Sequence, residues 1–346
     1  MGFNETLYRK VYIGDKAGKA QLLYGPKSAH RKTVTPLSVA RNSLVATTVG
    51  NYAVFGGGHA DRSSDIVDAY NASLTRTTPT ALSAARYGLA ATTVGNYALF
   101  GGGIYDYEGS HYSTVDAYSS SLTRTIPTSL RSSKRGLAAT TLGDYALFGG
   151  GIYQTDGSET AYAEVDTYNA SLTRGTATIL TQPRRELAAA TVGDHALFAG
   201  GYDWGDKDTV DAYDTSLTRT TPTKLSQSGY RLVGTTVGNY ALFGGGPGLG
   251  NVVNAYDTSL TRIIPAELSA IKDSLAATTV GDCALFGGGD GSGDYDTVDA
   301  YDSSLTKGTS DKLSVARSSL AATTIGDYAL FGGGSGKDTV DAFYMG

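Results

Sequence analysis

Residues 82–128 decide the fold of this chain. They read LSAARYGLAATTVGNYALFGGG at 82–103 and, after a variable segment, TVDAYSSSLTRTIPT at 114–128. Similar copies recur, and the glycine triplet of each copy (Ala-Gly-Gly in the fourth) begins at residue 56, 101, 149, 199, 244, 287 or 332. The spacings of 45, 48, 50, 45, 43 and 45 residues define seven copies that fill residues 37–346, numbered here repeats one to seven. Repetition at such a period is typical of propellers and other repeat architectures.

Each copy carries four short strand signals. In repeat two they are residues 89–94, 97–100, 114–118 and 121–127, and Gly95-Asn96 makes a turn between the first two. The segments are rich in β-branched and aromatic residues, and no helical period of 3.6 competes with them. Four short strands for each repeat predict an all-β fold, a seven-bladed β-propeller of four-stranded antiparallel blades.

The two ends of the chain are expected to meet in one blade. The last copy stops after its third strand, and residues 30–36, HRKTVTP, resemble the fourth-strand segments elsewhere. We expect this N-terminal segment to complete the last blade and so remove an open edge. This divides the chain into a leader, residues 1–29, and a propeller, residues 30–346. Within the leader, residues 7–13 and 20–24 predict a hairpin, either for docking to a neighbour or as a packed or frayed leader.

The strand–glycine–strand–tyrosine pattern resembles Kelch repeats, the family that includes propellers of the galactose oxidase type and many protein-binding propellers. The resemblance covers about nine-tenths of the chain and implies a Kelch-like propeller. Kelch blades usually carry Trp on the fourth strand, where this chain has Leu, as at Leu74, Leu122 and Leu172. The near-identity of the copies also resembles Kelch-like arrays of gut bacteria and their phages.

Repeated aromatic residues are expected to pack between blades. Five repeats place Tyr at the start of the second strand, where repeat four has His195 and repeat six has Cys283. Six repeats place Tyr on the third strand, and Phe343 replaces it in repeat seven. A structural role is therefore predicted for His195 and Cys283 as well. Because Cys283 is the only cysteine, the chain has neither an internal disulfide nor a multi-cysteine metal site.

Variation in length is confined to one loop in each repeat. Between the third glycine and the valine of the third strand lie 8, 11, 13, 8, 6, 8 and 5 residues, and 37 residues remain in each of the first six repeats. A constant scaffold with one variable loop is how recognition surfaces are often built. The loops are rich in acids and aromatics, which suit a glycan or a protein ligand. The predicted ligand-binding residues are Tyr105, Asp106, Tyr107, Glu108, Tyr112, Tyr153, Asp156, Tyr202, Trp204 and Tyr295.

A basic residue precedes the first strand in six of the seven repeats, and repeat five has Gly229 instead. These bases are expected on the same face as the variable loops, as a cationic ring near the mouth of the channel. The alternative is that each base pairs with the aspartate of a neighbouring strand or caps backbone carbonyls. The six bases are Arg41, Arg86, Lys134, Arg184, Lys272 and Arg317.

The sequence contains no motif for several common kinds of catalytic and binding chemistry. The four histidines are scattered without an HExxH pattern, and no GxSxG motif or phosphate-binding loop occurs. We therefore expect no catalytic residues, no cofactor and no metal, apart from a weak calcium candidate in the spacing of Asp290, Asp294 and Asp296. A net charge of −5 argues against nucleic acid as a partner.

No membrane span or signal peptide is expected, because no run of about 18 apolar residues occurs and the N-terminus has no apolar core. This favours a cytoplasmic or virion-associated location and leaves the oligomeric state open. The preferred interpretation is a non-enzymatic binding propeller. The alternatives are a Kelch-type sugar epimerase or lyase, and a structural part of a phage particle or surface appendage.

Overall fold

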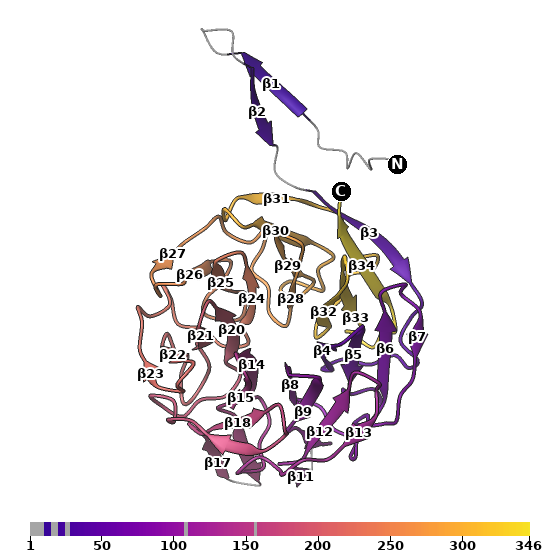
Figure 1. Ribbon diagram of the computed structural model, residues 1–346, viewed down its shortest axis with the longest axis vertical. Coiled ribbons are helices and arrows are strands. Elements are labelled where there is room, and N and C mark those ends of the chain that lie inside the picture. The colour runs from indigo at the N-terminus through magenta and orange to yellow at the C-terminus, as the bar shows by residue number, and fades with distance from the viewer. Residues whose placement is uncertain (1–9, 15–19, 25–27, 107–109, 156–157) are drawn as a thin grey trace.

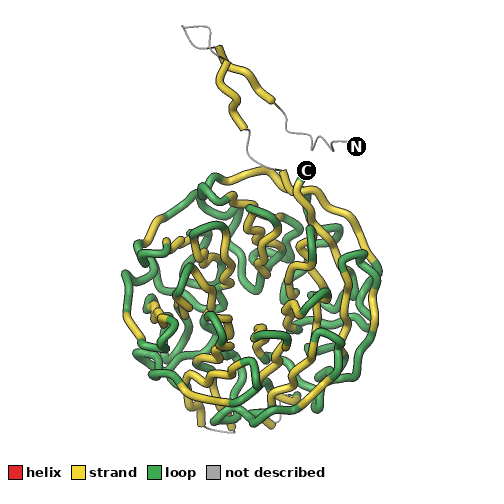
Figure 2. Tube along the Cα trace, viewed as in Figure 1, coloured by secondary structure: helices red, strands yellow, loops and turns green. Residues whose placement is uncertain are grey.

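The computed structural model describes residues 10–14, 20–24, 28–106, 110–155 and 158–346. Every regular element in these ranges is a β-strand. The strands follow one another around a common axis, and each repeat runs outward from the axis to the rim (Figure 1). Figure 2 shows that turns and loops make up nearly all of the remaining chain. No helical segment that could cross a lipid bilayer occurs in the described part of the chain. The fold is an all-β, propeller-like repeat architecture.

The strands fall into four positional classes. The first strands, nearest the axis, are β4 (Val45–Val49), β8 (Ala90–Val94), β14 (Ala138–Leu142), β20 (Ala188–Val192), β24 (Val233–Val237), β28 (Ala276–Val280) and β32 (Ala321–Ile325). The second strands are β5 (Tyr52–Gly56), β9 (Tyr97–Gly101), β15 (Tyr145–Gly149), β21 (His195–Ala199), β25 (Tyr240–Gly244), β29 (Cys283–Gly287) and β33 (Tyr328–Gly332). The third strands are β6 (Val67–Asn71), β12 (Val115–Ser119), β18 (Val165–Asn169), β22 (Val210–Asp214), β26 (Val253–Asp257), β30 (Val298–Asp302) and β34 (Val340–Met345).

The fourth strands lie at the rim, and smaller hairpins complete the set. The fourth strands are β7 (Arg76–Thr77), β13 (Arg124–Thr125), β19 (Arg174–Thr176), β23 (Arg219–Thr220), β27 (Arg262–Ile263) and β31 (Lys307–Ser310). The variable loops contain β10 (Ile104–Tyr105), β11 (Ser110–His111), β16 (Ile152–Thr155) and β17 (Ser158–Ala161). The N-terminal strands are β1 (Lys10–Gly14), β2 (Ala20–Tyr24) and β3 (Ser28–Val34).

Repeats one to five each form a four-stranded antiparallel sheet, and repeats six and seven belong to one eight-stranded sheet. The N-terminal strand β3 pairs with β34 from Ala29 opposite Met345 to Val34 opposite Val340. The predicted pairing of residues near 30–36 with the last strand is thus confirmed, although the strand begins at Ser28. Strand β3 also pairs in parallel with β31, which joins the two repeats.

The fourth strands are shorter than predicted. In repeat two the expected strand spanned residues 121–127, whereas β13 covers only Arg124–Thr125. Two local features limit it. Leu122 has a positive φ of 62° and so belongs to the turn, and Pro127 has no N–H to donate to a ladder. Five further repeats have Leu at the same turn position with φ between 59° and 63°. The leucines at this position therefore lie in turns.

The core between repeats is built from the predicted aromatics. On the third strands, Tyr118 and its counterparts are 0% exposed, and Phe100 of the second strand meets Tyr118 edge to face at 5.8 Å. The Tyr118 hydroxyl donates to the carbonyl of Thr80, 2.8 Å away, at the entry to its own repeat. Burial raises the pKa of Tyr118 well above its ordinary value, so the phenol stays neutral. The same phenol-to-backbone bond recurs in the other five repeats with this Tyr.

Threonine hydroxyls join the first strands of neighbouring repeats in a belt around the axis. One threonine of each first strand donates to the carbonyl of its counterpart in the preceding repeat; the donors are Thr93, Thr141, Thr191, Thr236, Thr279, Thr324 and Thr48. The bond from Thr48 to Thr324 joins repeats one and seven. Six of the seven donors also contact a second threonine hydroxyl, and since a hydroxyl has one proton, they must accept from it, as Thr93 does from Thr47 at 2.9 Å.

The belt is interrupted at Ala190, where repeat four lacks the threonine that six other repeats have. Changing Ala190 to Thr is expected to raise the free energy of unfolding by about 0.5–1.5 kcal/mol, because a new hydroxyl can donate to Thr236. The matched control is Thr235→Ala, which removes the corresponding bond to Thr279 and should lower stability by a similar amount. Urea denaturation of both variants measures this, and a loss of stability in both would contradict the role assigned to the belt.

Cys283 is 1% exposed on β29, in the slot that Tyr occupies in five other repeats. We expect it to react slowly with thiol reagents in the native protein and quickly in denaturant, because a buried thiol cannot meet the reagent. Mass spectrometry of labelling against time measures both rates. Fast labelling of the native protein would contradict the burial of this strand.

Candidate functional site

The variable loops and the entries to the first strands lie on the same face. The entry segment is the stretch of chain that leads into the first strand of a repeat. In five repeats this segment forms a backbone β-bridge with the variable loop of the same repeat, for example between Tyr87 and Ile104 and between Arg185 and Tyr202. In repeats two and three the longer loops continue as the hairpins β10–β11 and β16–β17. This face therefore carries both the variable loops and the entry segments, and we call it the loop face.

On the loop face, Asp106 ties the loop of repeat two to that of repeat one. Its Oδ1 accepts hydrogen bonds from the backbone N–H and the hydroxyl of Ser63, both at 2.9 Å, and its own N–H donates to the same hydroxyl. The backbone bond from Ser63 is the main cause that lowers the pKa of Asp106. Asp106 was predicted as a ligand-binding residue, but its contacts give it a part in positioning these two loops.

The loops of repeats two and three also contact each other. The rings of His111 and Tyr153 lie 4.9 Å apart, and the N–H of Gln154 donates to His111 Nε2 at 3.3 Å. Arg135, from the entry of repeat three, donates to Gln154 Oε1 at 2.8 Å. Tyr153 remains 36% exposed at this contact, so its ring is available to a ligand. The other predicted residues here, Tyr105 and Tyr112, are half-buried, while Tyr107, Glu108 and Asp156 lie outside the described residues.

Two arginines and two tyrosines from repeats four and five form a row, named here the Arg–Tyr row: Arg185, Tyr202, Tyr230 and Arg231. The rings of Tyr202 and Tyr230 lie 5.3 Å apart, Arg185 is 5.2 Å from the Tyr202 ring, and Arg231 is 5.4 Å from the Tyr230 ring. Such cation–π contacts hold a guanidinium at an aromatic face. Beyond Tyr202, Trp204 is 84% exposed at the tip of the same loop.

Arg231 also forms ion pairs with two carboxylates. It lies 3.5 Å from Glu186 and 3.1 Å from Asp273, which come from the entries of repeats four and six. Partial burial lowers the pKa of Arg231, but the two carboxylates outweigh it and the net pKa is raised. Arg231 therefore stays charged and links the entry segments of three consecutive repeats.

Arg185 and Tyr230 were not among the predicted site residues. Both occupy a pair of positions between the buried base and the following leucine, which read Asn-Ser, Tyr-Gly, Arg-Gly, Arg-Glu, Tyr-Arg, Asp-Ser and Ser-Ser in repeats one to seven. These two positions vary inside a segment that otherwise repeats closely. That contrast is the signal that could have identified them.

The predicted cationic ring requires a correction, because all six bases are 0% exposed. Each pairs with the third-strand aspartate of its repeat: Arg41–Asp68, Arg86–Asp116, Lys134–Asp166, Arg184–Asp211, Lys272–Asp299 and Arg317–Asp341, at 2.7–3.2 Å. Arg86 also donates to the carbonyl of Phe100 at 3.2 Å. The six side chains are thus buried against the third strands and present no charge to the channel mouth. The alternative of structural ion pairs is the one that the contacts support.

Repeat five lacks both members of this pair. Gly229 replaces the base, and Asn254 replaces the aspartate. Leu249, fully buried, fills the space, since a Cβ at Gly229 would lie 3.0 Å from the Leu249 Cβ. Asn254 keeps the backbone contact, accepting from the N–H of Ser226 at 2.9 Å, as Asp116 accepts from Ser83. The charges are lost together because one buried charge without its partner is costly.

The calcium hypothesis finds no support in the described residues. Asp290 Oδ1 accepts from the N–H of Gly291 at 2.8 Å, and Asp296 pairs with Lys312 at 3.1 Å. Asp294 is exposed, and neighbouring Tyr295 is half-buried. Across the described ranges, no three histidine, cysteine or acidic side chains are grouped so that they could hold a metal ion.

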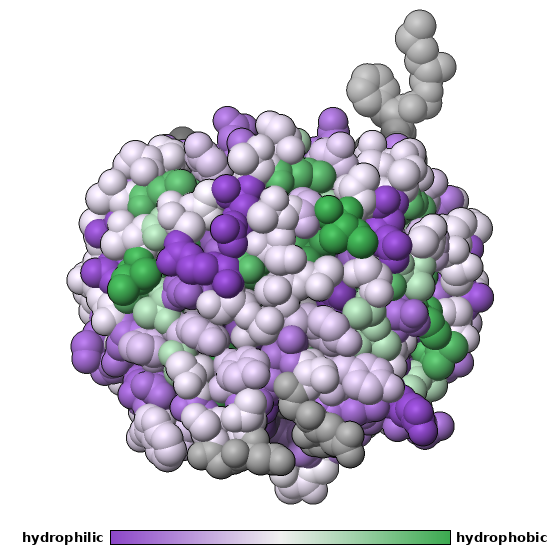
Figure 3. All heavy atoms as spheres, turned by 90° about the horizontal axis from the view of Figure 1, so that it is seen from below, coloured by the Kyte–Doolittle hydropathy of each residue, from purple (hydrophilic) through white to green (hydrophobic). Residues whose placement is uncertain are grey.

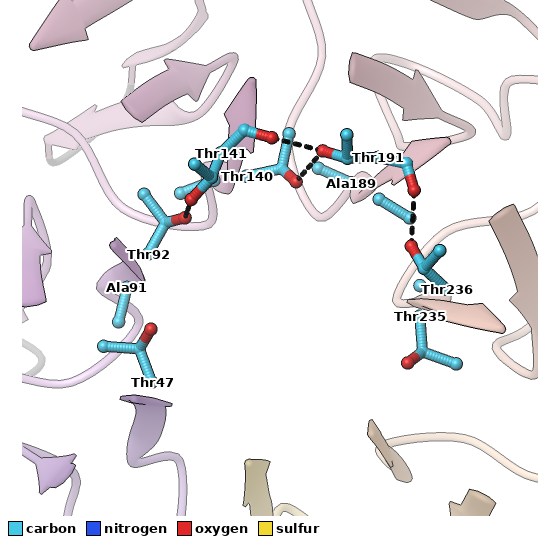
Figure 4. A pocket seen from close by; sticks show the side chains of 12 residues that line it. Thr47, Ala91, Thr92, Thr140, Thr141, Ala189, Thr191, Thr235 and Thr236 are labelled. Carbon is cyan, nitrogen blue, oxygen red and sulfur yellow. Dashed lines mark hydrogen bonds between the residues drawn. The ribbon is translucent and has the colours of Figure 1, made fainter. Parts of the chain in front are cut away.

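A cavity of about 310 Å³ lies on the axis of the molecule (Figure 4). Its lining residues are threonines, alanines and one glycine, among them Thr47, Thr140, Thr235 and Gly234. Figure 4 shows threonine hydroxyls engaged with one another and with backbone carbonyls around this opening. None of the lining residues titrates, so this cavity offers no side chain for acid–base chemistry.

No family model and no curated protein sequence matches the chain. Among solved structures, one titled "Structure of YjhT" is similar, with a TM-score of 0.58 and 13% sequence identity over 90% of this chain and 95% of that chain. At this identity the similarity shows the fold alone, and a fold shared by many proteins does not define an activity.

Proposed function

We propose that the chain is a closed, seven-bladed, Kelch-like β-propeller that binds a glycan or protein ligand through its loop face and catalyses no reaction. Three features support closure. Each of the seven repeats supplies the same inner strands, β3 completes the strand set of repeat seven, and the hydroxyl of Thr48 bonds to Thr324 across the first and last repeats. A closed ring leaves the loop face as the variable surface of a constant scaffold.

The observation that carries the binding function is the set of accessible aromatic and charged side chains that repeats three to five present on the loop face. Trp204 and Tyr153 are exposed, and the Arg–Tyr row lies in the same set of repeats. Aromatic rings with polar neighbours suit sugar faces as well as protein partners, since they offer apolar area and hydrogen bonds together. The backbone bridge between Arg185 and Tyr202 and the ion pairs of Arg231 hold the row in place, so the surface is organised before a ligand arrives.

The binding site is tested by first finding a ligand with the intact chain, on a glycan array and by pulldown. Replacing both Trp204 and Tyr153 by Ala is then expected to weaken binding more than tenfold, or about 1.4 kcal/mol, because exposed aromatic anchors dominate recognition. Titration calorimetry measures the affinity. The fold should survive, since neither side chain belongs to the buried set.

The matched control lies in the short loop of repeat seven, where Lys337 and Asp338 are both exposed. Changing both to Ala should leave the affinity unchanged. If this control loses more affinity than the aromatic variant, the wrong side of the ring has been assigned. If neither variant loses affinity, the loop face is not the binding site.

An enzymatic alternative, a sugar epimerase or lyase, would use the same face. Arg231 beside Glu186 and Tyr230 is the group that could serve it, because it combines a cation, a carboxylate and a phenol. Nuclear magnetic resonance of the bound ligand distinguishes the two functions. A binding protein leaves the ligand unchanged, whereas an enzyme converts it and loses turnover in Glu186→Gln.

A further inference from the structure

The fourth strands are the exposed edges of the sheets, and most of them end at a proline. Pro79, Pro127, Pro222 and Pro265 follow the two-residue strands of repeats one, two, four and five. A proline at this position cannot make the ladder bond that would extend the strand, so the strand stays short, and very short edge strands are a common way to prevent strand addition. Repeats three and six depart from this pattern. They read Gly-Thr-Ala and Gly-Thr-Ser, and their strands β19 and β31 extend to three and four residues.

The proline-free edge of repeat six accepts a strand. Strand β3 lies parallel to β31, with Ser28 opposite Thr309 and Ala29 opposite Ser310. The hydroxyls of Ser28 and Thr309 are 2.8 Å apart, and the N–H of Arg31 donates to Asp311 at 2.8 Å. The molecule itself thus shows that an edge of this sequence receives an extended N-terminal segment.

The edge of repeat three has the same sequence feature, but its outer side pairs with no strand in the described ranges. The N–H of Ala177 extends the ladder inward, to the carbonyl of Val165 at 3.1 Å. Gly175 and Thr176 are exposed, and Ile179 and Ile126 of the neighbouring repeat are each 53% exposed. Figure 3 views the molecule from the side of repeats two and three and shows apolar patches in a mostly polar rim. An open edge with apolar neighbours is suited to strand addition.

The N-terminal hairpin is the segment of this chain that would be stabilised by pairing with such an edge. Strands β1 and β2 pair with each other and stand outside the sheets in Figure 1. Their sequences, KVYIG and AQLLY, are largely apolar. A lone two-stranded hairpin is at best marginally stable in water, so a third strand would stabilise it. The hairpin cannot reach its own repeat three, because three residues separate β2 from β3 and span about 10 Å, while β18 lies across the ring.

We propose that the N-terminal hairpin of one copy adds to strand β19 of a second copy. The contact joins two different surfaces, so a bound pair still offers one free hairpin and one free edge. Such heterologous contacts build rings or open chains of molecules. The loop face takes no part in this contact, and the inference is independent of the proposed ligand binding.

The test is sedimentation velocity of the full chain over a wide concentration range. The wild type is expected to form species at multiples of 35.9 kDa that grow with concentration. Ala177→Pro, which gives repeat three the edge that four other repeats have, should leave only monomers. Val11→Pro with Ile13→Pro should do the same by disrupting β1. Thr176→Lys is a second edge variant, and Thr221→Lys at the equivalent position of proline-capped repeat four is the control that should still associate.

Mixing the edge variant with the hairpin variant tests whether the contact joins a hairpin to an edge. The edge variant keeps an intact hairpin and the hairpin variant keeps an intact edge, so an equimolar mixture should form dimers and nothing larger. A monomeric wild type at all concentrations would overturn the proposal. Association of the hairpin variant alone would overturn it as well, since two edges would then pair directly with each other.

Discussion

Replacing Arg86 by Met is expected to lower the free energy of unfolding by about 3–5 kcal/mol, the usual loss when one partner of a buried ion pair is removed. Arg86 and Asp116 are both 0% exposed and lie 2.7 Å apart. Without the guanidinium, the carboxylate keeps only the contacts with Ser83 and the more distant Arg124 at 3.7 Å. Urea denaturation followed by circular dichroism measures the loss.

The control is the double variant Arg86→Met with Asp116→Asn. Repeat five has already lost both charges, and Asn254 there still accepts the backbone N–H of Ser226. The double variant should therefore recover about 2 kcal/mol or more relative to Arg86→Met, because no buried charge is left alone. The single variant Asp116→Asn completes the cycle. If the loss in the double variant equals the sum of the two single losses, the pair has no coupling and the interpretation of repeat five is wrong.

Deleting residues 1–36 is expected to destabilise the whole set of repeats, whereas deleting residues 1–27 should have a mild effect. The longer deletion removes β3 and its ladder with β34, together with the ion pair of Arg31 and Asp341 at 3.2 Å. At about 1 kcal/mol for each net hydrogen bond, the loss is on the order of several kcal/mol. It also exposes the edges of β34 and β31 at once.

Thermal unfolding of both truncations measures this difference. The shorter deletion retains Ala29, which is 1% exposed in the core between repeats six and seven, and so is the matched control. A single cooperative transition at a lower temperature is expected for the longer deletion. Equal melting temperatures would contradict the role of β3 in completing the last repeat.

The architecture could be predicted because its determinants are local and repeated. Each strand and turn is specified within one copy of about 45 residues, and each copy packs mainly on its neighbours. The pairing of residues near 30–36 with the last strand followed from a missing fourth strand in repeat seven and was confirmed by the ladder between β3 and β34. The variable loops were likewise visible as the only segments that change in length.

The tertiary structure decided what the repeated side chains do. Arg86 precedes a strand, and its sequence is equally compatible with a cationic channel mouth and a buried ion pair. Only the path of its side chain toward Asp116 selects the pair. Likewise, Arg185 and Tyr202 are 17 positions apart and Tyr230 is 28 further along, yet they meet in one row, because a backbone bridge joins the first two within repeat four and the next repeat places Tyr230 beside them. The period of the sequence determines which strands form. Which side chains are buried, and which groups they contact, depends on how the neighbouring strands and repeats pack around them.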